Sequence, residues 1–171
     1  ENYFEAYLEL FPLRATQIGD HRYDHLLPVN IGAQHRAAQR KLDQETVGRL
    51  AAIDASALAP AERLHHEVLR HTLTARLEAG RFPNHLLPVR QLASLVIEFP
   101  ITGSGDGTHP FKTVVDYDNF LSRIDGFTAW VDQAIVNMRE GMRRGVVQPR
   151  AVIERTLPQL DAMIAATPEA S

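Results

Sequence analysis

The chain of 171 residues contains no cysteine. This absence excludes disulfides, thiolate metal sites and a cysteine nucleophile. The chain also has no apolar run near the ~20 residues that a membrane-spanning helix needs, so we expect no membrane span. Positive charge is in deficit, because 18 Lys and Arg stand against 21 Asp and Glu, for a net charge of −3. Nucleic-acid binding usually requires a basic face, so this balance argues against a DNA or RNA partner.

The strongest pattern that is present is an apolar stripe between Asp118 and Gly145. Because each residue turns an α-helix by about 100°, intervals of three or four residues put side chains on one helix face. Trp130 and Ala134 widen the stripe, as in a helix that faces a core. The stripe consists of Phe120, Ile124, Phe127, Val131, Ile135, Met138 and Met142. We expect this long helix to be the centre of the fold.

The residues at the two ends of this segment suit a helix start and a helix stop. Asp116 or Asp118 can accept the free amide hydrogens of the first turn. Arg143 and Arg144 complement the negative end of the helix dipole, and Gly145 can adopt the left-handed conformation that ends a helix.

Turn residues and apolar spacing predict four or five further helices. Pro12 is expected to stop the first helix, Asn30 to cap the second, and Pro60 to lie in the first turn of the third. A short helix from Pro88 is preferred to an extended segment. The predicted ranges are 1–10, 30–54, 60–80, 88–100 and 149–164. The fold class is therefore all-α, an irregular bundle of five or six helices around one long central helix, in a single domain covering 1–171.

Apolar spacing also assigns inner faces to these helices. The inward positions are Ala38, Leu42, Leu50 and Ile53 in the second, Leu64, Val68, Leu69, Leu73, Ala75 and Leu77 in the third, and Ile153, Leu157, Leu160 and Ile164 in the last. Two adjacent stripes in the third helix predict that it is deeply buried. Residues 15–24 are too polar for this pattern and are expected to form a structured loop.

The histidines of the third helix do not have the spacing of a zinc site. A helical zinc peptidase motif needs two histidines one turn apart, with Glu directly after the first. His71 lies six residues after His65 and five after His66, so these side chains point in different directions. We expect a polar helix face in which Glu67 pairs with His71, no metal site, and no cofactor in this chain.

Two other segments carry functional groups with an ordinary structural alternative. The glycines at 103, 105 and 107 resemble a phosphate-binding loop, but no Walker lysine follows, so a flexible loop that lines a groove is expected. Arg139, Arg143, Arg144 and Arg150 surround the turn at Gly145. They suit either an anion or substrate carboxylate, or a solvated helix end. Arg150 is retained as a candidate substrate-binding residue.

The densest group of polar side chains is the segment from Gly19 to Asp24. Tyr23 is expected to anchor it by burying its ring, with Asp20, His21, Arg22 and Asp24 at the surface. Loops often carry binding residues, so His21, Arg22, Tyr23 and Asp24 are the candidate substrate-binding residues, and none is assigned as catalytic. In the structural alternative, His21 and Asp24 only close the turn.

Three segments together resemble a bacterial family known as domain of unknown function 885. They are Phe11-Pro12 to Ala15-Thr16 with Gly19 and Tyr23-Asp24; His109-Pro110-Phe111-Lys112-Thr113 with Asp116-Tyr117, Phe120-Leu121 and Arg123; and Met138-Arg139-Glu140-Gly141-Met142 with Gly145, Gln148-Pro149-Arg150, Val152 and Gln159-Leu160. The resemblance covers nearly the whole chain and implies a largely helical, often exported or lipid-anchored protein, which favours a periplasmic or extracytoplasmic location.

The resemblance further implies a parent protein similar to zinc metallopeptidases, with the metal ligands in a carboxy-terminal region. That region carries a His-Glu pair followed by a Pro-Gly-His-His run; it is absent here, since no Pro-Gly-His occurs in the chain. We therefore expect this chain to be the amino-terminal fragment of a longer protein, without catalytic residues or zinc of its own. Its expected partners are the missing carboxy-terminal catalytic portion and a peptide substrate.

The expected function is to form a wall or lid of the parent's substrate cleft. The alternative is a stand-alone helical protein-interaction module. In the first case, helix faces that meet the missing portion are left bare, and an exposed apolar patch and self-association through it are expected. The pairs Leu86-Leu87 and Val146-Val147 are the candidates for that patch.

Overall fold

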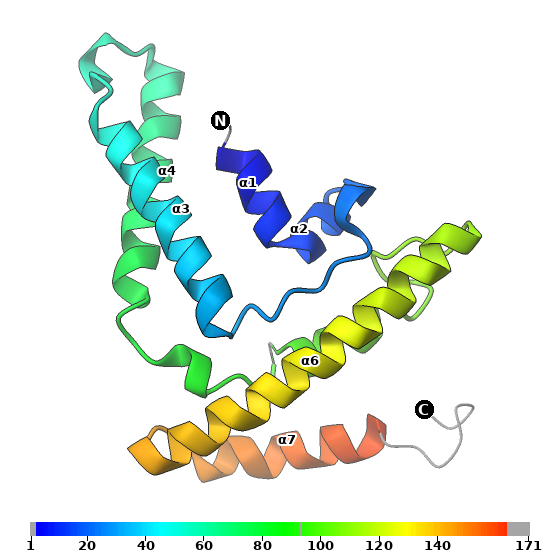
Figure 1. Ribbon diagram of the computed structural model, residues 1–171. Coiled ribbons are helices and arrows are strands. Elements are labelled where there is room, and N and C mark those ends of the chain that lie inside the picture. Colours follow the sequence, from blue (N-terminus) through cyan, green and yellow to red (C-terminus); the bar gives the residue numbers. More distant parts are fainter. Residues whose placement is uncertain (1–2, 93, 164–171) are drawn as a thin grey trace.

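The computed structural model describes residues 3–92 and 94–163, and all regular structure in these residues is helical (Figure 1). The α-helices are α1 (Tyr3–Leu10), α2 (Pro12–Gln17), α3 (Ala33–Ala51), α4 (Pro60–Ala79), α5 (Leu95–Thr102), α6 (Val114–Arg144) and α7 (Arg150–Met163). Short 3₁₀ helices η1 (His21–Tyr23), η2 (Ala55–Ala57) and η3 (Asn84–Leu86) lie between them. The all-α fold class is confirmed, with one long helix, α6, among shorter ones.

The helices form two arms that meet at an angle (Figure 1). α3 and α4 pack side by side as one arm, and α6 with α7 forms the other. α1 and α2 lie in the angle between the arms, where α1 packs against α3. Polar side chains join α1 to the first arm: Arg76 Nη1 donates to Tyr3 Oη at 3.1 Å and to Asp43 Oδ1 at 3.2 Å. Burial raises the pKa of the Asp43 carboxyl, and Arg76 opposes the rise.

The prediction that residues 15–24 are a loop was wrong for the first of them. Pro12 does not only end α1 but occupies the first position of α2, where its missing N–H costs nothing. Thr16 donates its hydroxyl to the Pro12 carbonyl within this helix. The chain then turns at Gly19, whose φ of 82° is in the left-handed region, and enters η1.

The start of α3 and the inner faces of α3 and α4 also differ from the prediction. Gly32, not Asn30, caps α3, because the Asn30 side chain accepts a hydrogen bond from Trp130 instead. On α3 the buried side chains are polar, Asp43 and Thr46, so apolar spacing could not find them. α4 has the predicted bounds, but Leu73 is its only buried residue.

Several of the residues predicted to face inward are exposed. On the first arm they are Ile53, which follows α3, and Leu64 and Val68 of α4. In α7, Ile153 and Leu157 line a cavity on the side of α6, as predicted, but both are partly open to solvent, and Ile164 lies outside the described residues. The short helix expected from Pro88 begins later, at Leu95, after an irregular segment.

The long helix is longer than predicted and turns a different face to the protein. Thr113 caps α6 by accepting from the amide of Asp116, whose carboxylate accepts from the amides of Lys112 and Thr113. Gly145 ends it with a φ of 69°, as predicted. The buried positions are Arg123, Trp130, Ala134, Asn137 and Gly141. The predicted stripe lies on the neighbouring face, and three of its members are exposed: Ile124 (40%), Ile135 (37%) and Met142 (71%).

Trp130 and Ala134 were correctly expected on the core side, and the polar residues of the buried face explain why the rest of it was missed. Arg123, Trp130 and Asn137 recur every seven residues, so they lie in one row along α6. Each donates to the segment that links η1 to α3. Arg123 Nε donates to the Leu26 carbonyl, Trp130 Nε1 to Asn30 Oδ1 and Asn137 Nδ2 to the Ile31 carbonyl. The segment 26–31 is therefore fixed on α6 by hydrogen bonds as well as by packing.

Close contact at Gly126 gives the first testable prediction. A Cβ at this position would lie 2.5 Å from the Leu27 carbonyl oxygen. Gly126→Ala is therefore expected to lower the free energy of unfolding by about 1–3 kcal/mol, because segment 26–31 must move away from α6. The matched control is Gly48→Ala in α3, where a Cβ meets no atom within 4 Å. There the better helix propensity of alanine should raise stability by about 0.5–1 kcal/mol. Urea denaturation measures both, and equal effects of the two variants would contradict the packing described.

A buried histidine gives a pH-dependent prediction. His35 packs edge-on against Phe11, with ring centroids 5.3 Å apart, and its buried Nε2 has no hydrogen-bond partner among residues 3–92 and 94–163. Burial lowers the pKa of His35 from its ordinary value of 6.5. As pH falls through 6.5 the unfolded chain takes up the proton first, so stability should decrease until the pH is below the folded pKa, and then level off. Burial and the charges of Arg36 and Arg144 lower the pKa of His85 too, so it adds to the same slope.

The experiment compares chemical denaturation of the wild type and His35→Gln between pH 7.5 and 5. The variant should lose part of the slope of the free energy of unfolding against pH. An unchanged slope in His35→Gln would show that His35 takes up its proton equally well in the folded chain.

Candidate functional site

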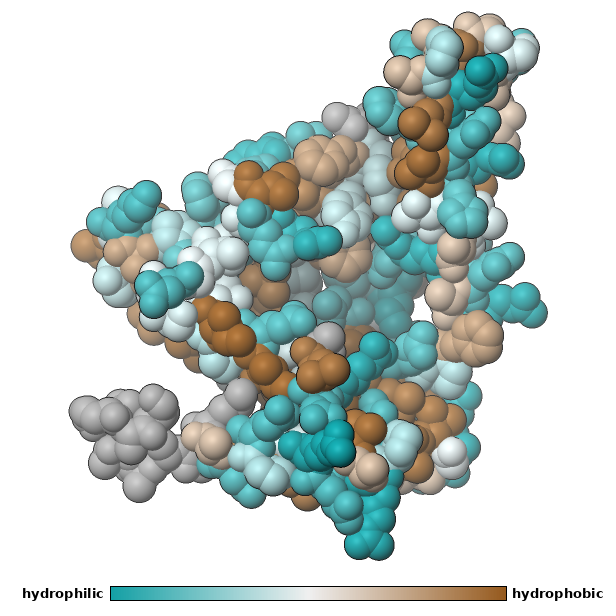
Figure 2. All heavy atoms as spheres, turned by 180° about the vertical axis from the view of Figure 1, so that it is seen from behind, coloured by the Kyte–Doolittle hydropathy of each residue, from teal (hydrophilic) through white to brown (hydrophobic). Residues whose placement is uncertain are grey.

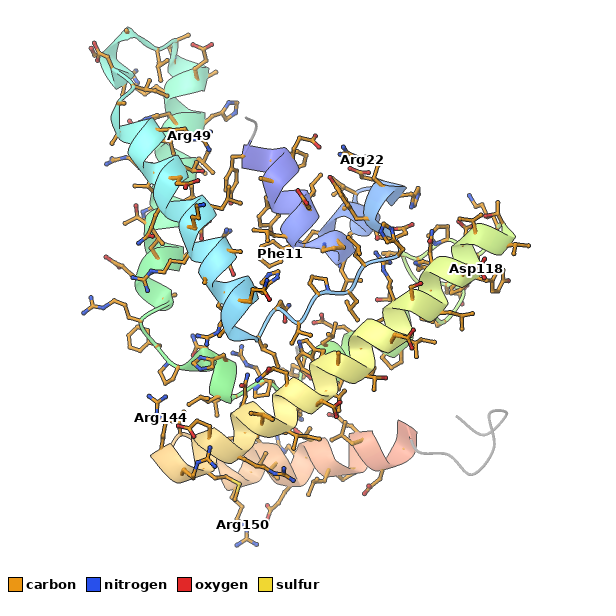
Figure 3. All side chains as sticks on the ribbon, in the orientation of Figure 1. Phe11, Arg22, Arg49, Asp118, Arg144 and Arg150 are labelled. Atoms are coloured by element: carbon orange, nitrogen blue, oxygen red, sulfur yellow. The ribbon has the colours of Figure 1, made fainter. Side chains whose placement is uncertain are left out.

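The candidate loop lies where α2 and η1 meet the amino-terminal half of α6 (Figure 3). Asp24 is its central residue and is only 1% exposed. The expectation that Asp24 lies at the surface is therefore wrong. Its carboxylate contacts the Thr16 hydroxyl, accepts from Arg123 Nη2 at 3.4 Å, and lies 2.8 Å from His21 Nδ1. These partners explain the burial, because a buried carboxylate is stable only when its oxygens are paired.

Arg123 is the positive charge that balances Asp24. Its side chain is 0% exposed, and burial lowers the pKa of its guanidinium to about 10, an effect that Asp24 opposes. The group is still charged at neutral pH. Its three nitrogens donate to α2, to segment 26–31 and to His109: Nη2 to Thr16 Oγ1 at 2.6 Å, Nε to the Leu26 carbonyl at 3.2 Å, and Nη1 to His109 Nδ1 at 2.9 Å.

His109 completes the buried network from the loop that precedes α6. Its Nε2–H donates to the Asp116 carbonyl at 2.8 Å, which leaves Nδ1 to accept from Arg123. Its ring packs against Phe111 and Phe120, with centroids 4.9 and 5.1 Å away. We call Thr16, Asp24, His109 and Arg123 the Arg123 network. All four side chains are nearly inaccessible to solvent, so the network holds segments together and does not contact a ligand in this form.

His21 and Arg22 form the accessible part of the loop. The His21 side chain is 54% exposed while its Nδ1 contacts the buried Asp24, so its Nε2 side faces outward. Arg22 pairs with Asp20 at 2.6 Å and with Glu5 of α1 at 2.7 Å. Hydrogen bonds from Arg22 lower the pKa of the Asp20 carboxyl. The guanidinium of Arg22 also lies 5.3 Å from the centre of the half-buried Tyr23 ring, which agrees with the anchoring position expected for Tyr23.

Arg150 is not part of this site. It lies at the opposite end of α6, at the start of α7, and its side chain is 91% exposed (Figure 3). Its Nε pairs with Glu154 of the same helix at 2.6 Å. The structure therefore brings together four of the five predicted substrate-binding residues and leaves Arg150 apart.

The predicted pairing of Glu67 with His71 on α4 is not formed. His66 contacts the Leu50 carbonyl of α3 through Nε2 at 2.9 Å, and Glu67 forms no ion pair with His71 in the described residues. Across residues 3–92 and 94–163, no three His, Asp or Glu side chains are grouped so that they could hold a metal ion. None of the described helices is both long and apolar enough to cross a bilayer.

The residues that the sequence analysis did not select are Arg123, His109 and Thr16. A usable signal was present, because Arg123 interrupts the apolar spacing of α6 and recurs with Trp130 and Asn137 every seven residues. Regularly spaced donors within a helix that otherwise reads as apolar indicate a face that binds backbone carbonyls.

Comparison with known proteins gives one match. A family described as "Bacterial protein of unknown function (DUF885)" matches residues 12–171 of the chain. No curated protein and no solved structure matches it.

Proposed function

Because the chain belongs to the DUF885 family of bacterial proteins, we propose that it is the non-catalytic, amino-terminal helical portion of a peptidase-like zinc protein. In this proposal it forms a wall or lid of the substrate cleft. The carboxy-terminal portion of the parent protein supplies the zinc ligands and the catalytic groups. The exposed side chains of His21 and Arg22, with Arg150 farther away, remain the candidates for contact with a peptide substrate.

The observation that carries this proposal is the bare apolar face of α6 and its surroundings. Leu121 is 60% exposed and Met142 71%, and both lie on the face of α6 next to the buried one. Seen from behind, the molecule also shows hydrophobic side chains at the surface of its lower half (Figure 2). Leu92, in the segment before α5, is 86% exposed. Monomeric proteins rarely leave a large contiguous apolar surface in water, so a partner that covers it is expected. In the isolated chain the same surface favours self-association.

The Arg123 network supports the same role. It fixes the loop with His21 and Arg22 to α6, so these two side chains are presented on a rigid base. A wall of a substrate cleft requires such a base, because contacts with a substrate add little to the binding free energy if the contacting loop must first be ordered.

The test compares this chain with the protein encoded by the complete reading frame. The complete protein should contain about one equivalent of zinc and hydrolyse peptides, as measured by elemental analysis and a quenched-fluorescence peptide library. The isolated chain should do neither, because a zinc site needs three or four converging ligands. Zinc at one equivalent in the dialysed chain, or peptide hydrolysis by it, would contradict the proposal.

The loop is tested in the complete protein by His21→Ala. We expect weaker activity with a nearly unchanged melting temperature, because the side chain is half exposed. If activity per folded molecule is intact and the melting temperature falls, His21 only closes the turn.

The alternative function is a stand-alone protein-interaction module that uses the same bare face of α6. A gene whose complete reading frame encodes no zinc-binding region would favour this alternative.

A further inference from the structure

The first half of α3 and the end of α4 lie side by side at the end of their arm that is nearest to η3 (Figure 1). Between these three elements is an open pocket of about 440 Å³, which we call the α3–α4 pocket. This volume is in the range of small-molecule sites. The polar and charged side chains that line the pocket include Arg36, Gln39, Arg40, Asp43, Arg76 and Asn84.

Two arginines of α3 give the pocket a positive charge. Arg36 and Arg40 are one helical turn apart, so their side chains share a face of α3. Both are exposed, and within residues 3–92 and 94–163 neither has a carboxylate partner. Two like charges at this spacing repel each other and destabilise a helix. The pair is therefore a cost to α3 that no described side chain offsets.

The carboxylate in the wall does not balance this charge. Among the lining residues, all of them in the described part of the chain, Asp43 is the only acid, and it is 1% exposed. Asp43 Oδ1 lies 3.2 Å from Nη1 of Arg76, so these two charges cancel. The charges of Arg36 and Arg40 remain, and the wall of the pocket carries a surplus of two positive charges.

The neighbouring elements η3 and α6 add to the positive field. His85 lines the pocket, and burial together with the charges of Arg36 and Arg144 lowers the pKa of His85. Arg144 is at the end of α6, on the side of η3 (Figure 3). Glu140 is close to both arginines at the end of α6 but forms its ion pair with Arg143. Arg144 therefore has no carboxylate of its own among the described residues.

Neutral donors and an aromatic ring complete the wall. Gln39 and Asn84 carry side-chain amides, and no side-chain hydrogen bond to either is formed within the described residues. Phe82 also lines the pocket and is 68% exposed. An aromatic ring that is this open to water is available to pack against an apolar or aromatic group.

We propose that the α3–α4 pocket binds a small phosphate monoester whose phosphate pairs with Arg36 and Arg40 and whose apolar or aromatic group lies on Phe82. A phosphate monoester carries close to two negative charges at neutral pH and has three strong acceptor oxygens. These oxygens suit two guanidinium forks with amide donors beside them. A single carboxylate would leave one of the two positive charges unbalanced.

This pocket is separate from the loop that carries His21 and Arg22, because no residue of that loop lines it. The inference therefore goes beyond the proposed function and does not rest on it. Its test needs neither zinc nor peptide hydrolysis, so its failure leaves the peptidase proposal standing, and the reverse.

The experiment titrates the 171-residue chain with phenyl phosphate at pH 7.5, followed by isothermal titration calorimetry. Benzoate offers the same ring with one negative charge, and phthalate offers the ring with two carboxylates. We expect phenyl phosphate to bind at one site and at least about tenfold more tightly than benzoate, since one charged hydrogen bond is worth roughly this factor. Phthalate should bind more weakly than phenyl phosphate. No saturable binding, or benzoate or phthalate binding as tightly as phenyl phosphate, would overturn the proposal.

A double variant of the two arginines locates the phosphate. Arg36→Gln with Arg40→Gln should weaken binding of phenyl phosphate at least about tenfold. Both side chains are exposed, so the melting temperature should be kept. The matched control is Arg63→Gln with Arg70→Gln, which removes the same charge from exposed positions of α4 outside the pocket. The control should change the affinity less than about twofold, because solvent and salt screen distant charges. Equal losses in the two double variants would show attraction by net charge alone and would contradict the proposal.

Phe82→Ala tests the position of the organic group. It should lower the affinity for phenyl phosphate to that for inorganic phosphate and leave binding of inorganic phosphate unchanged, because only the ring contact is lost. If phenyl phosphate binds to Phe82→Ala as tightly as to the wild type, the organic group does not lie on Phe82 and the proposed binding mode is wrong.

Discussion

Arg123→Met is expected to lower the free energy of unfolding by about 3–5 kcal/mol. The substitution keeps much of the side-chain volume but removes the buried guanidinium that balances Asp24, which is 1% exposed. An unpaired buried carboxylate is far more costly than a lost surface ion pair. Arg123→Met also removes the donors to Thr16, the Leu26 carbonyl and His109, so several buried acceptors lose a partner at once.

Two comparisons make this result specific. Arg143→Met breaks an exposed pair with Glu140 near the end of the same helix and should cost less than about 1 kcal/mol. Combining Arg123→Met with Asp24→Asn should cost less than the sum of the two single variants, because the second change removes the orphaned charge. Urea denaturation gives all four values. A loss below 1 kcal/mol for Arg123→Met would show that Asp24 is not balanced by Arg123.

Trp130→Ala is expected to lower the free energy of unfolding by about 3–5 kcal/mol. Trp130 is 2% exposed, stacks parallel to Phe127 with centroids 6.4 Å apart, and donates to Asn30 Oδ1 at 2.9 Å. Truncation leaves a large cavity on the buried face and releases the segment before α3. Trp130→Phe keeps most of the apolar volume, and the lost hydrogen bond should account for about 1 kcal/mol of its destabilisation.

Met142→Ala is the control that separates the two faces of α6. Met142 belongs to the stripe that the sequence predicted as core, but it is 71% exposed, so its truncation should cost less than about 1 kcal/mol in the isolated chain. A large loss at Met142 with a small loss at Trp130 would mean that the predicted face is the packed one after all.

The position and the carboxy-terminal end of α6 could be predicted because they depend on local signals, whereas its start lies a turn earlier, at the Thr113 cap. Apolar spacing set its length to within a few residues, and Gly145 adopts the left-handed stop. The packed face could not be predicted in the same way, because both faces carry regularly spaced large residues. The choice between them depends on Arg123, Trp130 and Asn137, whose partners lie about 100 residues earlier in the chain.

The candidate loop shows the same limit. Its density of polar groups marked Gly19 to Asp24 from sequence, and Tyr23 is half buried as expected. The burial of Asp24 was not predictable, because it depends on Arg123, 99 residues away.

Pro12 was ambiguous for a different reason. Proline both stops one helix and begins another, and only the packing of α1 against α2 decides that it does both here.

The most direct test of the central claim, that the bare face of α6 is covered in the complete protein, is the reactivity of one cysteine. The chain has no cysteine, so Leu121→Cys introduces a single thiol on that face. Its rate of maleimide labelling is compared in the isolated chain and in the complete protein, read at that peptide by mass spectrometry. Gln44→Cys, at an exposed position of α3, is the control and should react equally in both. We predict that Leu121→Cys reacts at least tenfold more slowly in the complete protein. Equal rates would show that this face stays open and would contradict the account.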